Sequence, residues 1–209
     1  HTIICSVFLT FFNKKSYLRV INEQTRMAGI YIHIPFCKQR CRYCAFYSST
    51  LYNIREAYVD ALCKELLMRK EYIAGEIVGT IYLGGGTPST LTMEQLKRIC
   101  DTIYNNYPVT DAPEVTIECN PDDLIPEFLE QLKGLPFNRI SMGIQSFNDA
   151  QLMRLGRRHT AEAARQAVAN TRAAGYSNIS IDLMFALPGS SRAEWQETLD
   201  TAIALRPEH

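Results

Sequence analysis

Three cysteines stand close together in the sequence, at Cys37, Cys41 and Cys44. Thiolates bind soft metals and iron–sulfur clusters. Three thiolates at this spacing can ligate three irons of a [4Fe–4S] cube and leave the fourth iron open to another ligand. A structural zinc site needs a fourth ligand, usually from a second cysteine pair or a histidine pair. No second pair exists, and the nearest downstream histidine is His159. The spacing therefore indicates a cluster; a zinc site completed by a distant residue, or three unrelated thiols, are the alternatives.

The elements that must position these cysteines form a regular series. From residue 29 onward, short apolar segments alternate with longer segments of helical periodicity. Strands are predicted at 30–34, 78–83, 114–119, 138–144 and 178–184, and helices at 54–72, 92–105, 123–133, 160–174 and 192–205. Repeated βα units imply a parallel sheet. We therefore expect an α/β fold of about five βα units, a partial or full (β/α) barrel of the TIM type, with its site at the carboxyl ends of the strands.

Polar or flexible residues occur where these strands end. The cysteine loop follows the first strand and the glycine run 84–86 follows the second. Glu118 ends the third strand, Gln145 follows the fourth and Asp182 lies late in the fifth. Strand side chains alternate between the two faces of a sheet, so Glu118 and Asp182 lie on the face opposite their apolar neighbours. We expect these groups to converge at one mouth of the barrel.

The overall composition narrows the class of protein. The chain has 22 basic and 22 acidic residues and a formal net charge of 0, so no global field favours nucleic acid or an anionic membrane. Seven cysteines, an odd number with three of them clustered, argue against a secreted disulfide scaffold. The other four cysteines look structural. We expect a cytoplasmic protein with no nucleic-acid partner and no stable membrane insertion.

The two ends of the chain differ from the βα series. Residues 3–12 are mostly apolar but too short to span a bilayer, and no basic segment or cleavage site marks a signal peptide. An amphipathic anchor is the alternative. Because Met27 directly precedes the first strand, we expect residues 1–26 to be a non-native or disordered leader and residues 27–209 to form the domain. The chain stops after a helix, where another strand would begin, so we expect a domain truncated at its C-terminal end.

The motifs carry a resemblance to a known family. The cysteine spacing, with Tyr43 before the third cysteine, resembles the cluster loop of radical S-adenosylmethionine (SAM) enzymes. The segment 31–37 is similar to the branch that contains the oxygen-independent coproporphyrinogen III oxidases. Together with segments 84–89, 142–147 and 181–184, it most resembles the heme chaperone HemW. The resemblance runs from about Met27 to the last residue.

The resemblance implies roles for individual residues. Cys37, Cys41 and Cys44 would ligate the [4Fe–4S] cluster, and the segment Gly85, Gly86 and Thr87 would hold the amino group of SAM. Glu118, Gln145 and Asp182 would make polar contacts to SAM, including its ribose hydroxyls. Arg157 would bind the SAM carboxylate, with Arg158 as an adjacent competitor for that role. Tyr31 and Tyr43 would pack on SAM near the cluster. No catalytic residue is assigned. His33 is either a base or heme ligand, or a hydrogen-bonded histidine of the barrel.

The resemblance also implies an activity and partners. In the family, SAM chelates the open iron, and one electron from the cluster cleaves it to methionine and a 5′-deoxyadenosyl radical. An oxidase of this branch is expected to have a further cysteine two residues after Cys44, where this chain has Phe46, and HemW-like proteins commonly have Asp where it has Ala45. We therefore expect a heme chaperone that carries heme as cargo to heme-acceptor proteins, with a flavodoxin or ferredoxin as electron donor. The C-terminal domain of the branch would be missing. A coproporphyrinogen III oxidase-type enzyme that binds a porphyrin, and an inert fragment, are the alternatives.

Overall fold

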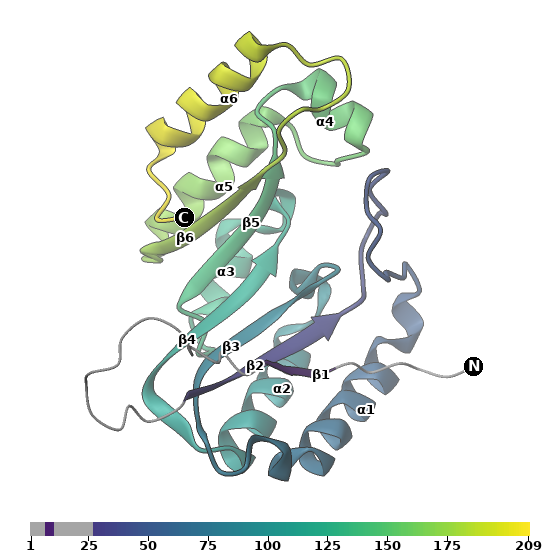
Figure 1. Ribbon diagram of the computed structural model, residues 1–209, viewed down its shortest axis with the longest axis vertical. Coiled ribbons are helices and arrows are strands. Elements are labelled where there is room, and N and C mark those ends of the chain that lie inside the picture. Colours follow the sequence, from purple (N-terminus) through teal and green to yellow (C-terminus); the bar gives the residue numbers. More distant parts are fainter. Residues whose placement is uncertain (1–6, 11–26) are drawn as a thin grey trace, which may run out of the picture.

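A single curved sheet organises the protein. The computed structural model describes residues 7–10 and 27–209, and their six strands are ordered β1 to β6 along the chain and across the sheet (Figure 1). The strands are β1 (Val7–Thr10), β2 (Met27–Ile34), β3 (Ile77–Gly85), β4 (Val109–Cys119), β5 (Arg139–Gln145) and β6 (Asn178–Leu183). β1 pairs with β2 in the antiparallel direction, and each later strand is parallel to its predecessor. The five parallel strands confirm the expected partial barrel of βα units.

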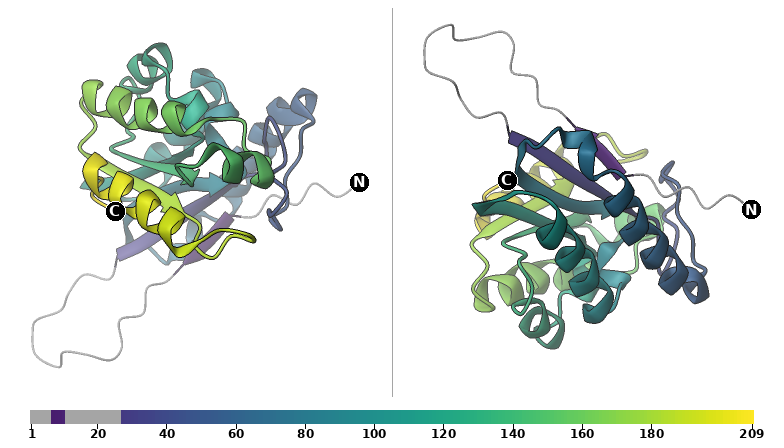
Figure 2. Two further views of the ribbon diagram at one scale, coloured as in Figure 1. Left: turned by 90° about the horizontal axis from the view of Figure 1, so that it is seen from above. Right: turned by 90° about the horizontal axis from the view of Figure 1, so that it is seen from below.

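The helices form an outer layer on one side of this sheet. Seen from above, they lie along an arc outside the curved strands (Figure 2). The helices are α1 (Arg55–Met68), α2 (Met93–Asn106), α3 (Pro126–Leu132), α4 (Asp149–Leu155), α5 (Ala161–Ala173) and α6 (Arg192–Leu205). Five of the six match predicted helices. The additional one, α4, is short, and it is capped by the Asn148 side chain at one end and by left-handed Gly156 at the other.

The core lies between the sheet and the helices. Alternate residues of β2 point into it, and Ile30, Ile32 and Ile34 are essentially inaccessible to solvent. α2 contributes Leu96 and Ile99 from the apolar stripe that its periodicity predicts. Fully burying an aliphatic side chain of this size contributes about 1.5–3 kcal/mol. The core therefore fixes which strand face is left for the concave side, and that face carries the polar residues.

Segments near both ends of the chain make hydrogen bonds with the sheet. Val7–Thr10 pairs along Gly29–Ile32 at the edge of the sheet, and the remainder of the expected leader, residues 1–6 and 11–26, lies outside the described residues. After α6 the chain returns to β6, where the Glu208 amide donates to the Ile179 carbonyl over 3.0 Å and the Ile181 amide donates to the His209 carbonyl over 2.9 Å. No helix within residues 27–209 is long and apolar enough to cross a membrane.

Candidate cluster and cofactor site

The cysteine loop is clamped at its base. It begins where β2 ends, and the Cys37 amide donates to the Ser49 carbonyl over 3.0 Å while the Ser49 amide donates to the Pro35 carbonyl over 2.6 Å. Between these bonds, the buried ring of Phe36 meets Tyr58 edge-on, with the ring centres 5.3 Å apart. Both ends of the loop are therefore fixed to the sheet, and the cysteines lie on the segment between them.

The three loop cysteines are free thiols, and each is half-buried. Within the described ranges, no three His, Cys, Asp or Glu side chains are gathered tightly enough to hold a single metal ion. A [4Fe–4S] cube would bind the three cysteine sulfurs at three separate irons.

Two neighbouring side chains donate hydrogen bonds to these thiols. The Thr87 hydroxyl donates to Cys37 Sγ over 3.5 Å, and Arg157 Nη1 donates to Cys41 Sγ over 3.3 Å. Burial raises the pKa of Cys37, donation from Thr87 opposes that rise, and the nearby Cys44 and Cys41 add to it. The thiols are thus close enough to influence one another, and they face hydrogen-bond donors suited to thiolates or cluster sulfurs.

The glycine run lies against the start of the cysteine loop. Gly85 has φ +106°, and a Cβ there would stand 2.2 Å from His33 Nδ1. A Cβ at Gly86 would stand 2.7 Å from the Ile34 carbonyl oxygen, to which the Gly86 amide donates over 2.8 Å. The Thr87 amide then donates to the Phe36 carbonyl over 2.8 Å. Only glycine permits this contact, so the run joins the carboxyl ends of β2 and β3.

Glu118 is held by two donors from the neighbouring strand. The Tyr82 hydroxyl donates to Oε1 over 2.6 Å, and the Gly85 amide donates to Oε2 over 2.9 Å. Burial raises the pKa of Glu118, and these two bonds oppose the rise. Tyr82 also stacks on Tyr31, with ring centres 5.9 Å apart. Burial, with the Glu118 charge in second place, raises the pKa of Tyr31 to about 12. Tyr31, Tyr82 and Glu118 therefore form one packed group on the concave face.

Arg157 and Arg158 both lie beside Cys41, but their side chains have different partners. Arg157 Nη2 donates to Asn120 Oδ1 over 2.7 Å and to the Gly143 carbonyl over 2.5 Å, in addition to the contact of Nη1 with Cys41. Its Nε is buried and has no hydrogen-bond partner among the described residues. Arg158 instead forms ion pairs with the two acidic residues at 122 and 123. The adjacent arginines thus differ in their contacts: Arg157 donates to Cys41, whereas Arg158 is neutralised by acidic side chains.

Tyr43 joins the same corner. Burial is the main reason that the pKa of Tyr43 rises to about 12; the nearby Arg157 opposes the rise and the nearby Cys41 adds to it. His33, by contrast, has partners at both ring nitrogens: the Tyr31 hydroxyl lies 3.3 Å from Nδ1, and the Tyr47 carbonyl lies 3.3 Å from Nε2. These contacts link the strand to the loop, and they favour the structural interpretation of His33.

Gln145 and Asp182 lie farther along the sheet, at the ends of β5 and β6. Gln145 has φ +70°, which is uncommon for a residue with a side chain, and its backbone interrupts the β5–β6 register. Asp182 is exposed and pairs in register with Gly143. The structure therefore brings the cysteines together with Thr87, Tyr43 and Arg157, and it places Gln145 and Asp182 at the other end of the same row of strand ends.

Two residues of the site were missed by the sequence analysis. Tyr82 alternates with buried Ile81 and Leu83 along β3, so strict alternation would have assigned it to the concave face. Asn120 directly follows β4, and the preference of functional groups for the carboxyl ends of strands would have selected it. Neither residue belongs to a motif that the resemblance carried.

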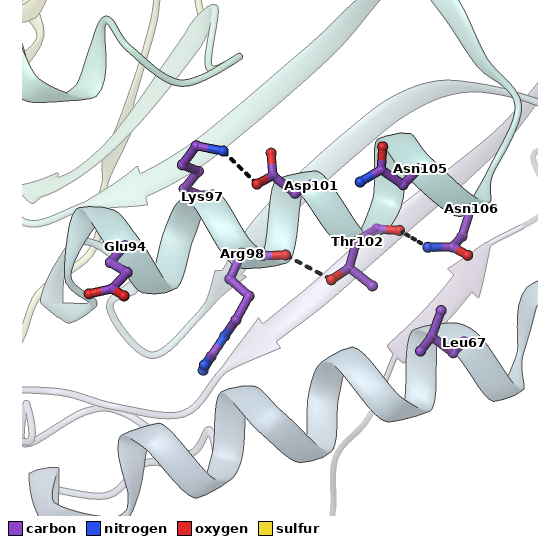
Figure 3. Close-up of a pocket in the computed structure, with 8 residues that line it drawn as sticks. All are labelled: Leu67, Glu94, Lys97, Arg98, Asp101, Thr102, Asn105 and Asn106. Carbon is purple, nitrogen blue, oxygen red and sulfur yellow. Dashed lines mark hydrogen bonds and ion pairs between the residues drawn. The ribbon is translucent and has the colours of Figure 1, made fainter.

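Two hollows of the surface are lined by residues other than the loop cysteines. A groove of about 370 Å³ opens between α1 and α2 on the outer helical layer, away from the strand ends (Figure 3). In its lining, Lys97 contacts Asp101 at 2.5 Å (Figure 3), and Arg98 pairs with Glu56 and Asp60 of α1. A second hollow of about 440 Å³ lies on the concave face and is lined by Tyr31, Tyr82 and Arg139, among others. The concave hollow adjoins the Tyr31–Tyr82–Glu118 group.

Comparison with known proteins gives consistent matches. The model of the radical SAM superfamily matches residues 31–202. The chain is 38% identical over 185 residues to the heme chaperone HemW of Bacillus subtilis strain 168, covering 88% of this chain and 49% of that protein. It is 36% identical over 183 residues to the HemW of Escherichia coli K12, covering 87% and 48%.

A solved structure gives the same picture. The coproporphyrinogen III oxidase HemN of E. coli, described as a radical SAM enzyme, superposes with a TM-score of 0.78 at 30% identity, covering 85% of this chain and 42% of that one. The chain spans about half the length of the curated relatives it matches.

Proposed function

The chain belongs to the radical SAM superfamily, and from this premise we propose that it is the cluster- and SAM-binding part of a HemW-like heme chaperone. Membership of the superfamily implies a [4Fe–4S] cluster and SAM. The observation that carries the site assignment is the group of three free thiols on one clamped loop, two of which accept hydrogen bonds from side chains of other loops. When bound, the cluster would supply one-electron reduction of SAM.

The residues of the chain have separable tasks in this proposal. Cys37, Cys41 and Cys44 hold the cluster. Arg157 takes the carboxylate of SAM, because its Nε is a buried donor without a partner and a guanidinium suits a carboxylate. Gly85, Gly86 and Thr87 lie beside the loop and hold the amino group. Tyr31 and Tyr43 cover SAM and exclude water, which strengthens the polar contacts within the site.

The remaining polar residues complete the SAM site. Glu118 is already oriented by Tyr82 and Gly85, so it can accept a hydrogen bond from a ribose hydroxyl without reorganising. Gln145 and Asp182 would contact SAM from β5 and β6. We assign no residue to proton transfer. The assignment is tested by reconstituting the protein with iron and sulfide without oxygen: a reducible [4Fe–4S] spectrum that SAM perturbs is expected, and bound zinc without that spectrum would refute it.

The chaperone role rests on the curated relatives, which are named heme chaperones. The position two residues after Cys44 is an exposed phenylalanine, Phe46, rather than the further cysteine expected of an oxidase. In the proposed role, a protein of the full length of these relatives binds heme as cargo and delivers it to heme-acceptor proteins in the cytoplasm. A flavodoxin or ferredoxin would reduce the cluster.

The second candidate is a coproporphyrinogen III oxidase-type enzyme, and the likeness to HemN favours it. One experiment separates the two. A protein of the full length of the curated relatives is reconstituted, then incubated in parallel with heme plus an apo-acceptor and with coproporphyrinogen III plus SAM and reductant. The chaperone predicts heme transfer and no porphyrinogen decarboxylation. Turnover of the porphyrinogen without heme transfer would reverse the assignment.

A further inference from the structure

A chain of hydrogen bonds connects two of the three cysteines through Asn120. Asn120 Nδ2 donates to Thr87 Oγ1 over 3.3 Å, and Thr87 donates to Cys37 Sγ over 3.5 Å. On its other side, Asn120 Oδ1 accepts from Arg157 Nη2 over 2.7 Å, and Arg157 Nη1 reaches Cys41 Sγ over 3.3 Å. The half-buried amide of Asn120 therefore stands between the two side chains that donate to the cysteine loop.

The direction of every bond in this chain follows from the chemistry of its members. A guanidinium has donors and no acceptor, so the Asn120 oxygen must face Arg157. The amide nitrogen then faces Thr87 and must donate to its hydroxyl oxygen. Because that oxygen accepts from Asn120, its own hydrogen is free for Cys37. One amide thus sets both the position of the arginine and the orientation of the hydroxyl.

The location of Asn120 suits this task. It is the first residue after β4, at the start of the 3₁₀ turn Pro121–Asp123, and its side chain makes no capping bond to that turn. Its amide is therefore committed to the site rather than to the local backbone. On the far side of the same turn, Asn170 Nδ2 donates to the Leu124 carbonyl over 3.0 Å. Asn170 holds this segment from α5 without touching the cysteine loop.

We propose that Asn120 is a positioning residue that aligns Arg157 and Thr87 as donors to the cluster sulfurs and keeps Arg157 in place for the carboxylate of SAM. The inference rests on the proposed function, because it needs a cluster on the cysteine loop. Hydrogen bonds to cluster sulfurs favour the reduced, more negative state and so raise the reduction potential. Removing the amide should therefore lower the potential and weaken SAM binding while the three ligands remain.

The experiment compares Asn120→Ala, Asn120→Asp and Asn170→Ala after anaerobic reconstitution. Iron and sulfide content, the midpoint potential followed by electron paramagnetic resonance, and the Kd for SAM are measured. Asn120→Ala should keep the cluster, weaken SAM binding roughly tenfold, and lower the equilibrium constant for reduction by roughly tenfold, which is about 59 mV for one electron. Asn170→Ala, which perturbs the same segment from outside, should leave both quantities unchanged.

Asn120→Asp separates the contact with Arg157 from the contact with Thr87. A carboxylate still accepts from Arg157, so SAM affinity should stay within about threefold of the wild type. It cannot donate to Thr87, so the hydroxyl turns toward the carboxylate and the potential should fall. A double-mutant cycle tests the Thr87 arm further: Asn120→Ala should shift the potential less in a Thr87→Val background than in the wild type.

The outcomes separate the two proposals. If the wild-type protein forms no cluster that SAM perturbs, the proposed function fails. If the wild type forms one and Asn120→Ala matches it in both potential and Kd, the role of Asn120 alone is overturned. Should Asn120→Ala lose the cluster, the isosteric Asn120→Asp decides: wild-type potential in that variant overturns the inference, and a lowered potential with retained SAM binding supports it.

Discussion

Gly85 and Glu118 come from neighbouring parallel strands, and the backbone amide of the first donates to the carboxylate of the second over 2.9 Å. The bond places a buried carboxylate directly beside the glycine cradle. Gly85 itself has a positive φ of +106°, a backbone conformation that favours glycine. A residue of the proposed SAM site is thus oriented by the backbone of another.

Replacing Glu118 by alanine should weaken SAM binding about tenfold while the cluster still assembles. The change leaves the Tyr82 hydroxyl and the Gly85 amide without their acceptor, and lost buried hydrogen bonds typically cost about 1–3 kcal/mol. Calorimetric titration of SAM into reconstituted protein measures the effect. Glu114→Ala is the matched control, because Glu114 is an exposed residue of the same strand. Equal affinities in the two variants would remove Glu118 from the site.

Gly85→Ala should destabilise the fold far more than Gly75→Ala. Both glycines have positive φ, so each substitution carries a backbone strain of about 1–2 kcal/mol. A Cβ at Gly75 meets nothing within 4 Å, whereas a Cβ at Gly85 meets the His33 ring. Urea unfolding measures both variants. Adding His33→Ala to Gly85→Ala should restore part of the loss, and the absence of any restoration would show that the clash is not the cause.

Cys41→Ala should abolish the iron–sulfur spectrum, because two thiolates do not hold a cube with one open iron. Absorption and iron content after anaerobic reconstitution measure the loss. Cys63→Ala is the control, since Cys63 is a half-buried free thiol on α1. A full cluster in the Cys41 variant, or its loss in the Cys63 variant, would contradict the ligand assignment.

The stability of the protein should fall as the pH drops from 6.5 toward 4, partly because of His159. Its side chain is buried, its Nε2 donates to the Ile144 carbonyl over 3.1 Å, and burial, followed by the charge of Arg157, lowers the pKa of His159 from 6.5 to about 4. Below pH 6.5, His159 takes up a proton in the unfolded chain but stays neutral in the folded chain until about pH 4. Its contribution to the free energy of unfolding is therefore complete above pH 6.5 and is lost as the pH falls from 6.5 toward 4.

The size of this effect is about 3 kcal/mol across that interval. Urea denaturation of the wild type and of His159→Gln at a series of pH values measures it. The glutamine variant keeps a donor for the Ile144 carbonyl and has no titrating group, so its stability should depend less steeply on pH. Parallel pH profiles for the two proteins would show that His159 is protonated in both states or in neither.

The βα series could be predicted from the sequence because the hydrophobic periodicity of its segments agrees with which residues are buried in the fold. In α2, for example, the apolar stripe and the capping pair Thr92 and Gln95 point to the same helix. The additional helix α4 escaped prediction because its single apolar turn is too short for periodicity to register. The strand Val7–Thr10 escaped because its pairing with β2 is a long-range contact across a segment without turn signals.

Within the site, the motif residues were predictable and their partners were not. Arg157 and Arg158 are equivalent in sequence, and only their tertiary contacts separate them: Arg157 donates to Cys41, whereas Arg158 pairs with acidic residues 122 and 123. Asn120 has only the weak signal of its place after a strand, where an asparagine is most simply a turn residue. Its significance arises from the meeting of three strand ends, which is a property of the tertiary structure.

At Gln145, the left-handed backbone makes the stability of the fold and the proposed contact to SAM favour different residues. A residue with a side chain in that conformation costs roughly 1–2 kcal/mol relative to glycine. Gln145→Gly would therefore relieve strain and raise the melting temperature, while it removes the side-chain amide that we propose as a contact to SAM. A library selected for thermal stability alone would enrich this substitution and yield more stable proteins that lack one side chain of the proposed site. The position should therefore be held fixed in any such selection.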